Sequence, residues 1–108
     1  MNIKQELKAI LLRHEGKARA IKSWELAQIV HCDERKVRLI IRGLITDGLP
    51  VASSTEPPAG YFIVATRREA ERYASAIRSR LIEDALRRRD FRRAADQYLT
   101  PAMQGRLI

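Results

Sequence analysis

The chain has 108 residues, 45% of them hydrophobic and 31% charged, which fits one folded domain with an appended element and excludes general disorder. No run of about 18 apolar residues is present and charges alternate at the N-terminus, so we expect neither a membrane-spanning helix nor a secretory signal. The 21 lysines and arginines outnumber the 13 acidic residues, and the net charge of +8 favours a polyanionic partner, of which nucleic acid is the commonest.

The first part of the chain is predicted to begin with two helices. Apolar residues recur at helical spacing over residues 3–14, and Gly16 ends this first helix. After an extended piece at residues 19–22, Ser23 is a suitable N-cap for a second, short helix over residues 24–30. A tight turn then leads into a third helix.

The third helix is predicted from residue 34 to about residue 46, with Asp33 as its N-cap and a glycine stop signal at residues 47–48. At about 100° per residue, four apolar side chains share one face, which we expect to be buried; they are Val37, Ile40, Ile41 and Leu44. The opposite face carries Arg35, Arg38, Arg42, Leu39 and Thr46. The sequence therefore predicts a helix that buries one side and presents arginine on the other.

The second half is predicted to contain a hairpin and a long helix. Two short extended runs, residues 49–53 and 61–64, flank a loop rich in proline and glycine, which is typical of a β-hairpin. Thr66 and Glu69 have capping-box spacing and open a helix that we expect to end near residue 89, where Asp90 starts a further short helix.

Apolar residues of this C-terminal region fall into two groups. Tyr73, Ile77 and Leu81 form the main stripe of the long helix, and we expect this stripe to cover the N-terminal part of the protein. A second group is left without an obvious partner and predicts a homodimer interface; it consists of Ile82, Leu86, Phe91, Tyr98 and Leu99. The alternative is that the tail folds back and buries these residues within one chain.

Several short sequence patterns occur in an order typical of one kind of domain. They are SWELAQIVHCDERKVR at residues 23–38, IRGLITDGLPV at residues 41–51 and GYFI at residues 60–63. Together they resemble the winged helix-turn-helix domain of the biotin-repressor N-terminal type, over roughly residues 3–65. The expected fold is thus mainly α with a small β-hairpin: a winged helix-turn-helix domain (1–65) followed by a basic helical extension (66–108) for packing or dimerisation.

The resemblance implies a protein that binds double-stranded DNA with its third helix in the major groove, which is about 12 Å wide and admits one helix. In the family, residues at the start of this helix read bases, which makes Arg35, Lys36 and Arg38 the candidates here. We expect Arg42 to meet phosphate and Leu39 to touch a thymine methyl group or a protein partner. Candidate groups outside this helix are Lys17, Arg19 and Lys22 for the DNA backbone, and the hydroxyl groups of Ser54 and Thr55 for phosphate.

One departure from the family concerns the hairpin loop, whose tip at residues 53–58 carries no cation. Insertion of this loop into the minor groove is therefore not expected. The sequence leaves two functions open: a DNA-binding transcriptional regulator or phage-type replication or packaging accessory, and a protein-interaction or assembly module without sequence-specific DNA binding. RNA binding is less expected, because no aromatic platform for bases is evident.

Catalytic and metal-binding patterns are lacking in the sequence. His14 and His31 do not have the spacing to Cys32 that a four-ligand metal site requires. No phosphate-binding glycine loop or nucleophile elbow is present. We therefore expect a cytoplasmic protein that is not an enzyme and has no cofactor or metal, with Cys32 as a structural cysteine at the apolar turn position.

Overall fold

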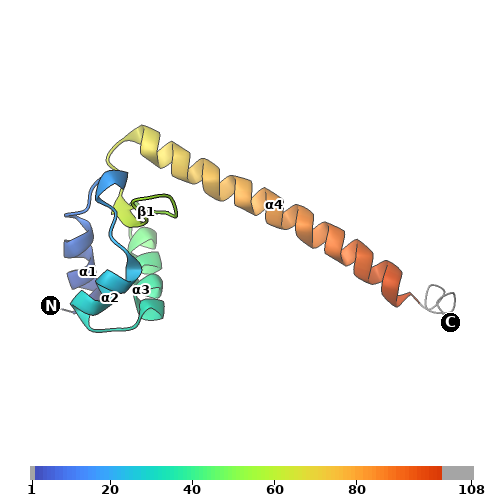
Figure 1. The fold of residues 1–108 in the computed structure, drawn as a ribbon, viewed down its shortest axis with the longest axis horizontal. Helices are drawn as coiled ribbons and strands as arrows, with labels where there is room; N and C mark the ends of the chain where they lie inside the picture. Colours follow the sequence, from blue (N-terminus) through green and yellow to red (C-terminus); the bar gives the residue numbers. More distant parts are fainter. Residues whose placement is uncertain (1, 101–108) are drawn as a thin grey trace. The chain divides into compact units, whose positions relative to one another are not determined.

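The structure is a computed structural model that describes residues 2–100. Within these residues the chain is mainly helical and has one two-stranded antiparallel hairpin (Figure 1). The elements are α1 (Ile3–Leu11), the 3-10 helix η1 (Lys17–Arg19), α2 (Ser23–Val30), α3 (Glu34–Thr46), β1 (Val51–Ser54), β2 (Gly60–Ile63) and α4 (Arg67–Leu99). The predicted class, mainly helical with a small hairpin and a long C-terminal helix, is confirmed.

Internal contacts divide the chain into two units, Met1–Tyr73 and Ala74–Ile108, which we call the N-terminal and C-terminal units. The N-terminal unit holds the hydrophobic core. Leu7, Leu11, Leu26 and Val37 are its largest fully buried side chains, and they come from α1, α2 and α3. The hairpin closes this core because Val51 and Ile63, which face each other across the two strands, join the same cluster.

The third helix is the best-predicted element. It runs from Glu34 to Thr46, and the carboxylate of Asp33 caps it by accepting the Lys36 backbone N–H at 2.7 Å. Val37, Ile41 and Leu44 are buried, as their spacing predicts. Cys32, just before the cap, is half-buried and packs against the core.

The first helix ends earlier than predicted, at Leu11 instead of residue 14. The reason is that the backbone beyond it pairs with β2: the carbonyl of His14 accepts the Ile63 N–H at 2.8 Å, and the Gly16 N–H donates to the Ile63 carbonyl at 2.7 Å. Ile21 makes a second such contact, exchanging two backbone hydrogen bonds of 2.7 and 2.8 Å with Tyr61. Gly60 permits this approach, because a Cβ there would collide with the Ile21 carbonyl.

The predicted N-cap of the second helix is wrong by one residue. The helix begins at Ser23 and residue 22 occupies the cap position. Ser23 does not cap the helix because its hydroxyl donates instead to the Glu34 carboxylate on α3, at 2.6 Å. The side chain therefore joins two helices where a local cap was expected.

The C-terminal helix is longer than predicted. It continues unbroken to Leu99, so its expected end near residue 89 and the new helix at Asp90 are both wrong. Arg67–Leu99 contains no glycine or proline, and arginine is a good helix former. Asp90 does not cap a helix because its carboxylate accepts from the guanidinium of Arg89, at 3.2 Å from Nη2. Ile77 and Leu81 of the predicted main stripe are 45% and 68% exposed on this helix.

Candidate nucleic-acid interface

The outer face of α3 is the candidate interface. Because Val37, Ile41 and Leu44 hold the inner face of the helix in the core, the side chains on the other side point to solvent. These exposed side chains are Arg35, Arg38, Leu39 and Arg42, and Leu39 is 63% exposed. Lys36 is exposed too, on another side of the helix. The structure thus places four of the five helix residues predicted as DNA contacts on one face, and Lys36 apart from them.

Neither of two acidic residues near this face neutralises its arginines. Asp47, at the end of α3, pairs with Lys4 of α1 at 2.6 Å. The Glu34 carboxylate accepts from the hydroxyl of Ser23. Across residues 2–100 no ion pair involves Arg35, Arg38 or Arg42. The face therefore presents three guanidinium groups whose charge is not neutralised by a salt bridge.

The hairpin approaches the first turns of α3 near Tyr61. Burial raises the pKa of the Tyr61 hydroxyl, while the positive charge of Arg38 opposes this rise and the charge of Glu34 adds to it. The charge of Tyr73 also raises this pKa, by more than that of Glu34 does. On the hairpin, the Ser53 hydroxyl lies 3.4 Å from that of Tyr73. The charge of Arg38 therefore acts on the hairpin as well as on the candidate helix face.

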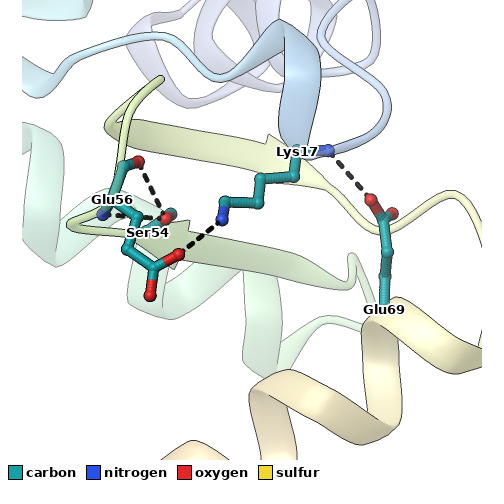
Figure 2. A network of polar contacts seen from close by, with 4 residues as sticks. All are labelled: Lys17, Ser54, Glu56 and Glu69. Carbon is teal, nitrogen blue, oxygen red and sulfur yellow. Dashed lines mark hydrogen bonds and ion pairs between the residues drawn. The ribbon is translucent and has the colours of Figure 1, made fainter.

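Lys17 joins three segments of the N-terminal unit, as Figure 2 shows. Its ammonium group pairs with the Glu56 carboxylate of the hairpin loop at 3.1 Å, and its backbone N–H donates to the Glu69 carboxylate of α4 at 3.0 Å. Lys17, predicted as a contact to the DNA backbone, thus has an exposed acidic partner in this structure, and its contact with DNA stays a prediction. Arg19 and Lys22, predicted for the same role, are exposed.

The hairpin loop uses one predicted hydroxyl for its own turn. The Ser54 hydroxyl donates to the Glu56 carbonyl at 3.1 Å and accepts the Glu56 N–H at 3.2 Å (Figure 2). Its proton is thus already engaged, and a phosphate would have to break this bond. Thr55 is exposed at the tip. Of the two hydroxyl groups proposed for phosphate contact, only that of Thr55 is accessible without a change in the turn.

The residues predicted for dimerisation all lie on α4 and are exposed; the exposed fractions are 49% for Ile82, 45% for Leu86, 70% for Phe91, 67% for Tyr98 and 62% for Leu99. Because the helix is unbroken, residues 82 and 91 lie about 180° apart on it. Phe91 and Tyr98 share one side with Ile77 and Leu81, whereas Ile82 and Leu86 lie on the opposite side. The five residues therefore do not form one contact surface on a single partner helix.

Sequence reasoning missed the role of Glu69 beyond its own helix. Its backbone N–H donates to the Thr66 hydroxyl at 3.1 Å, which is half of the predicted capping box. Its carboxylate instead accepts the Ala65 N–H at 2.7 Å and the distant Lys17 N–H at 3.0 Å. The capping signal identifies the residue, but no local pattern indicates that it bonds to a segment 52 residues away.

Glu69 gives a test of the structure through pH. The N–H groups of Ala65 and then Lys17 hold the pKa of this carboxyl below its ordinary value. Stabilisation by the charged form is thus complete above the ordinary pKa and is lost as the pH falls through the lowered one. We expect Glu69→Gln to lower the free energy of unfolding by about 1 kcal/mol at neutral pH, in urea melts.

The difference between Glu69→Gln and the unchanged chain should shrink when the melts are repeated at pH values that fall through the lowered pKa of Glu69, because the carboxyl then becomes neutral as the amide is. Glu71→Gln is the matched control, because Glu71 lies on the same helix and contacts only Arg67, at 3.9 Å. A pH-independent difference for Glu69→Gln, or an equal effect of Glu71→Gln, would contradict the assigned bonds.

Comparisons of the chain with protein-family models, with curated proteins and with solved structures give no match. Within residues 2–100, no group of three or more histidine, cysteine, aspartate or glutamate side chains is arranged to hold a metal ion. None of the helices in that range has the apolar length needed to cross a bilayer. The function must therefore be argued from the geometry and charge of the N-terminal unit.

Proposed function

We propose that the protein binds double-stranded DNA as a winged helix-turn-helix protein, with α3 in the major groove and the β1–β2 hairpin as the wing. The observation that carries this proposal is the outer face of α3, where Arg35, Arg38 and Arg42 are exposed and free of ion pairs. Guanidinium groups donate in a fork that fits both phosphate and the guanine edge. Such a face suits contact with DNA.

The proposed roles differ along the helix. Arg35 and Arg38 belong to its first turns, the part that reaches base edges in helix-turn-helix complexes. Arg42, two turns further on, suits a phosphate. Of the three arginines, Arg38 is the one whose charge also acts on the Tyr61 hydroxyl of the hairpin. We therefore assign base reading to Arg38 first. A regulator of transcription or an accessory in replication or packaging would use such a face in the same way.

Charge outside α3 supports the same function. Residues 1–22 carry six basic and two acidic residues, whereas residues 23–48 carry four of each. Arg19 and Lys22 from the first of these segments are exposed and available for the DNA backbone. The hairpin contributes little, because Glu56 is its one charged residue and pairs with Lys17.

The first prediction concerns the dependence of binding on salt. If α3 and the N-terminal segment together neutralise about five phosphates, log K for a labelled duplex should fall with log salt at a slope near −4.5. Fluorescence anisotropy at several salt concentrations measures this slope. The proposal fails if no duplex DNA is bound at about 50 mM salt, and tighter binding of duplex RNA of the same sequence at the same salt concentration would assign the face to RNA.

A second candidate function rests on Leu39. This side chain is 63% exposed in the middle of the arginine face, and a large exposed apolar group there also suits a protein partner with an acidic rim. In that case the protein is an interaction or assembly module. Failure of the DNA titration together with saturable binding to a polyanionic peptide would support this candidate.

A further inference from the structure

Four of the exposed apolar side chains of α4 lie at coiled-coil spacing. Between residues 77 and 98, seven positions are separated by alternating steps of four and three: Ile77, Leu81, Asp84, Arg88, Phe91, Ala95 and Tyr98. This alternation is the heptad spacing that places residues on one side of two paired helices. Because α4 is unbroken, all seven lie along one side, which we call the α4 seam. Leu81, Phe91 and Tyr98 in it are each about two-thirds exposed or more.

The two charged positions of the seam decide how a second helix can pack against it. In a parallel pair each seam residue faces its own copy, so Asp84 would face Asp84 and Arg88 would face Arg88. Both contacts bring like charges together away from water, which is costly. In an antiparallel pair the two kinds of heptad position face each other, and Asp84 of each copy then faces an arginine.

We propose that two copies of the chain pair through the α4 seam as an antiparallel coiled coil, with Asp84 of each copy opposite the partner's Arg88. This register places Leu81 opposite the partner's Phe91, and Ile77 opposite the partner's Ala95. Two large side chains, Leu81 and Phe91, thus meet next to the ion pairs. Further from the centre, Ile77 meets the small side chain of Ala95. We take the partner of the seam to be a second copy of the chain. The reason is that two such seams have complementary charges when the two helices run antiparallel, and like charges face each other when they run parallel.

Contacts already present in one chain do not prevent this pairing. Asp84 accepts from Arg87 at 3.0 Å, with both side chains about 70–80% exposed. Such an exposed pair contributes little to stability and leaves the second carboxylate oxygen free. Within the dimer, the pair between Asp84 and the partner's Arg88 fixes orientation and register more than it adds stability.

The residues beside the seam predict how the dimer responds to salt. Arg78, Arg80, Arg87 and Arg92 flank it at the neighbouring heptad positions, so like charges from two copies come close. Added salt screens this repulsion, and the dimer should strengthen as salt rises. DNA binding is expected to change in the opposite direction.

Charge reversal tests the register. In sedimentation equilibrium, Arg88→Asp should convert the dimer to a monomer. The substitution places an aspartate opposite Asp84 of the other copy in both of the central contacts. Adding Asp84→Arg in the same chain should restore the dimer, since the pair is then merely exchanged. Circular dichroism reports whether each variant keeps its helix content. A double variant that stays monomeric while helical would overturn the proposed contact.

Cross-linking tests the orientation. In a Cys32→Ala background, a mixture of chains carrying Ile77→Cys and Ala95→Cys should form a disulfide dimer, because a disulfide needs Cα atoms within about 7 Å. Ile77→Cys alone should cross-link at most a tenth as fast. Faster cross-linking of Ile77→Cys alone means a parallel pair and overturns the proposal. A monomer at all concentrations up to about 100 µM overturns it as well, whatever the DNA titration shows.

Discussion

Arg38→Ala is expected to weaken binding to the preferred duplex by about 1–3 kcal/mol, which is about fivefold to 150-fold, and to relax base preference at one position. The reason is that a bidentate arginine is matched to guanine alone among the bases. The measurement is a selection from duplexes with randomised positions, followed by anisotropy on the selected duplex and on a random one. Arg38 is exposed on α3 outside the core, so the fold should be unaffected.

Arg93→Ala is the matched control for charge. It removes the same charge from α4 at an exposed position outside the α4 seam and the positions that flank it. We expect it to weaken all duplexes about equally and slightly, without changing base preference. If the two variants have equal, small effects on both duplexes, α3 does not read sequence and the protein binds DNA by charge alone, or does not use this face.

The fold could be predicted where the signals are local. Asp33 as a cap, the apolar spacing of α3 and the glycine that follows it all act within one helix, and they gave its limits to the residue. The hairpin was predicted for the same reason. The end of α1 could not be, because residues 14–16 leave the helix to bond with β2, a strand about 50 residues later. Pairing between distant segments then overrides a helical pattern.

The residues of the candidate site could be predicted from the sequence, but the bonds that engage the acidic residues around them could not. Helical spacing alone placed Arg35, Arg38 and Arg42 on the outer face. Whether nearby acids neutralise them depends on contacts between elements, such as Lys4 with Asp47 and Ser23 with Glu34. No pattern in the sequence indicates these pairs. The same holds for Lys17, whose ion pair with Glu56 crosses 39 residues.

In the C-terminal helix, by contrast, a weak local signal predicts a helix end that is absent from the structure. A basic segment with an aspartate suggested a break at Asp90, and the break would have separated Phe91 and Tyr98 from the first part of the helix. An unbroken helix instead brings them into line with Ile77 and Leu81. The predicted dimer surface therefore changes from the side of Leu86 to the opposite side.

Leu81→Asp is expected to convert the dimer into a monomer with the 12.4 kDa mass of one chain, as measured by light scattering at tens of micromolar. The substitution places a charge against the partner's Phe91, in the apolar contact next to the central ion pairs. Leu86→Asp introduces the same change on the other side of α4 and should leave the dimer intact. A monomeric Leu86→Asp, or a dimeric Leu81→Asp, would show that the α4 seam is not the interface.

The same pair of variants connects the dimer to DNA binding. A duplex that carries two half-sites should lose about a hundredfold in affinity on Leu81→Asp, because the second contact is then no longer intramolecular. A duplex with one half-site should bind both variants equally, and an equal loss on the two duplexes would mean that each copy binds DNA independently of its partner.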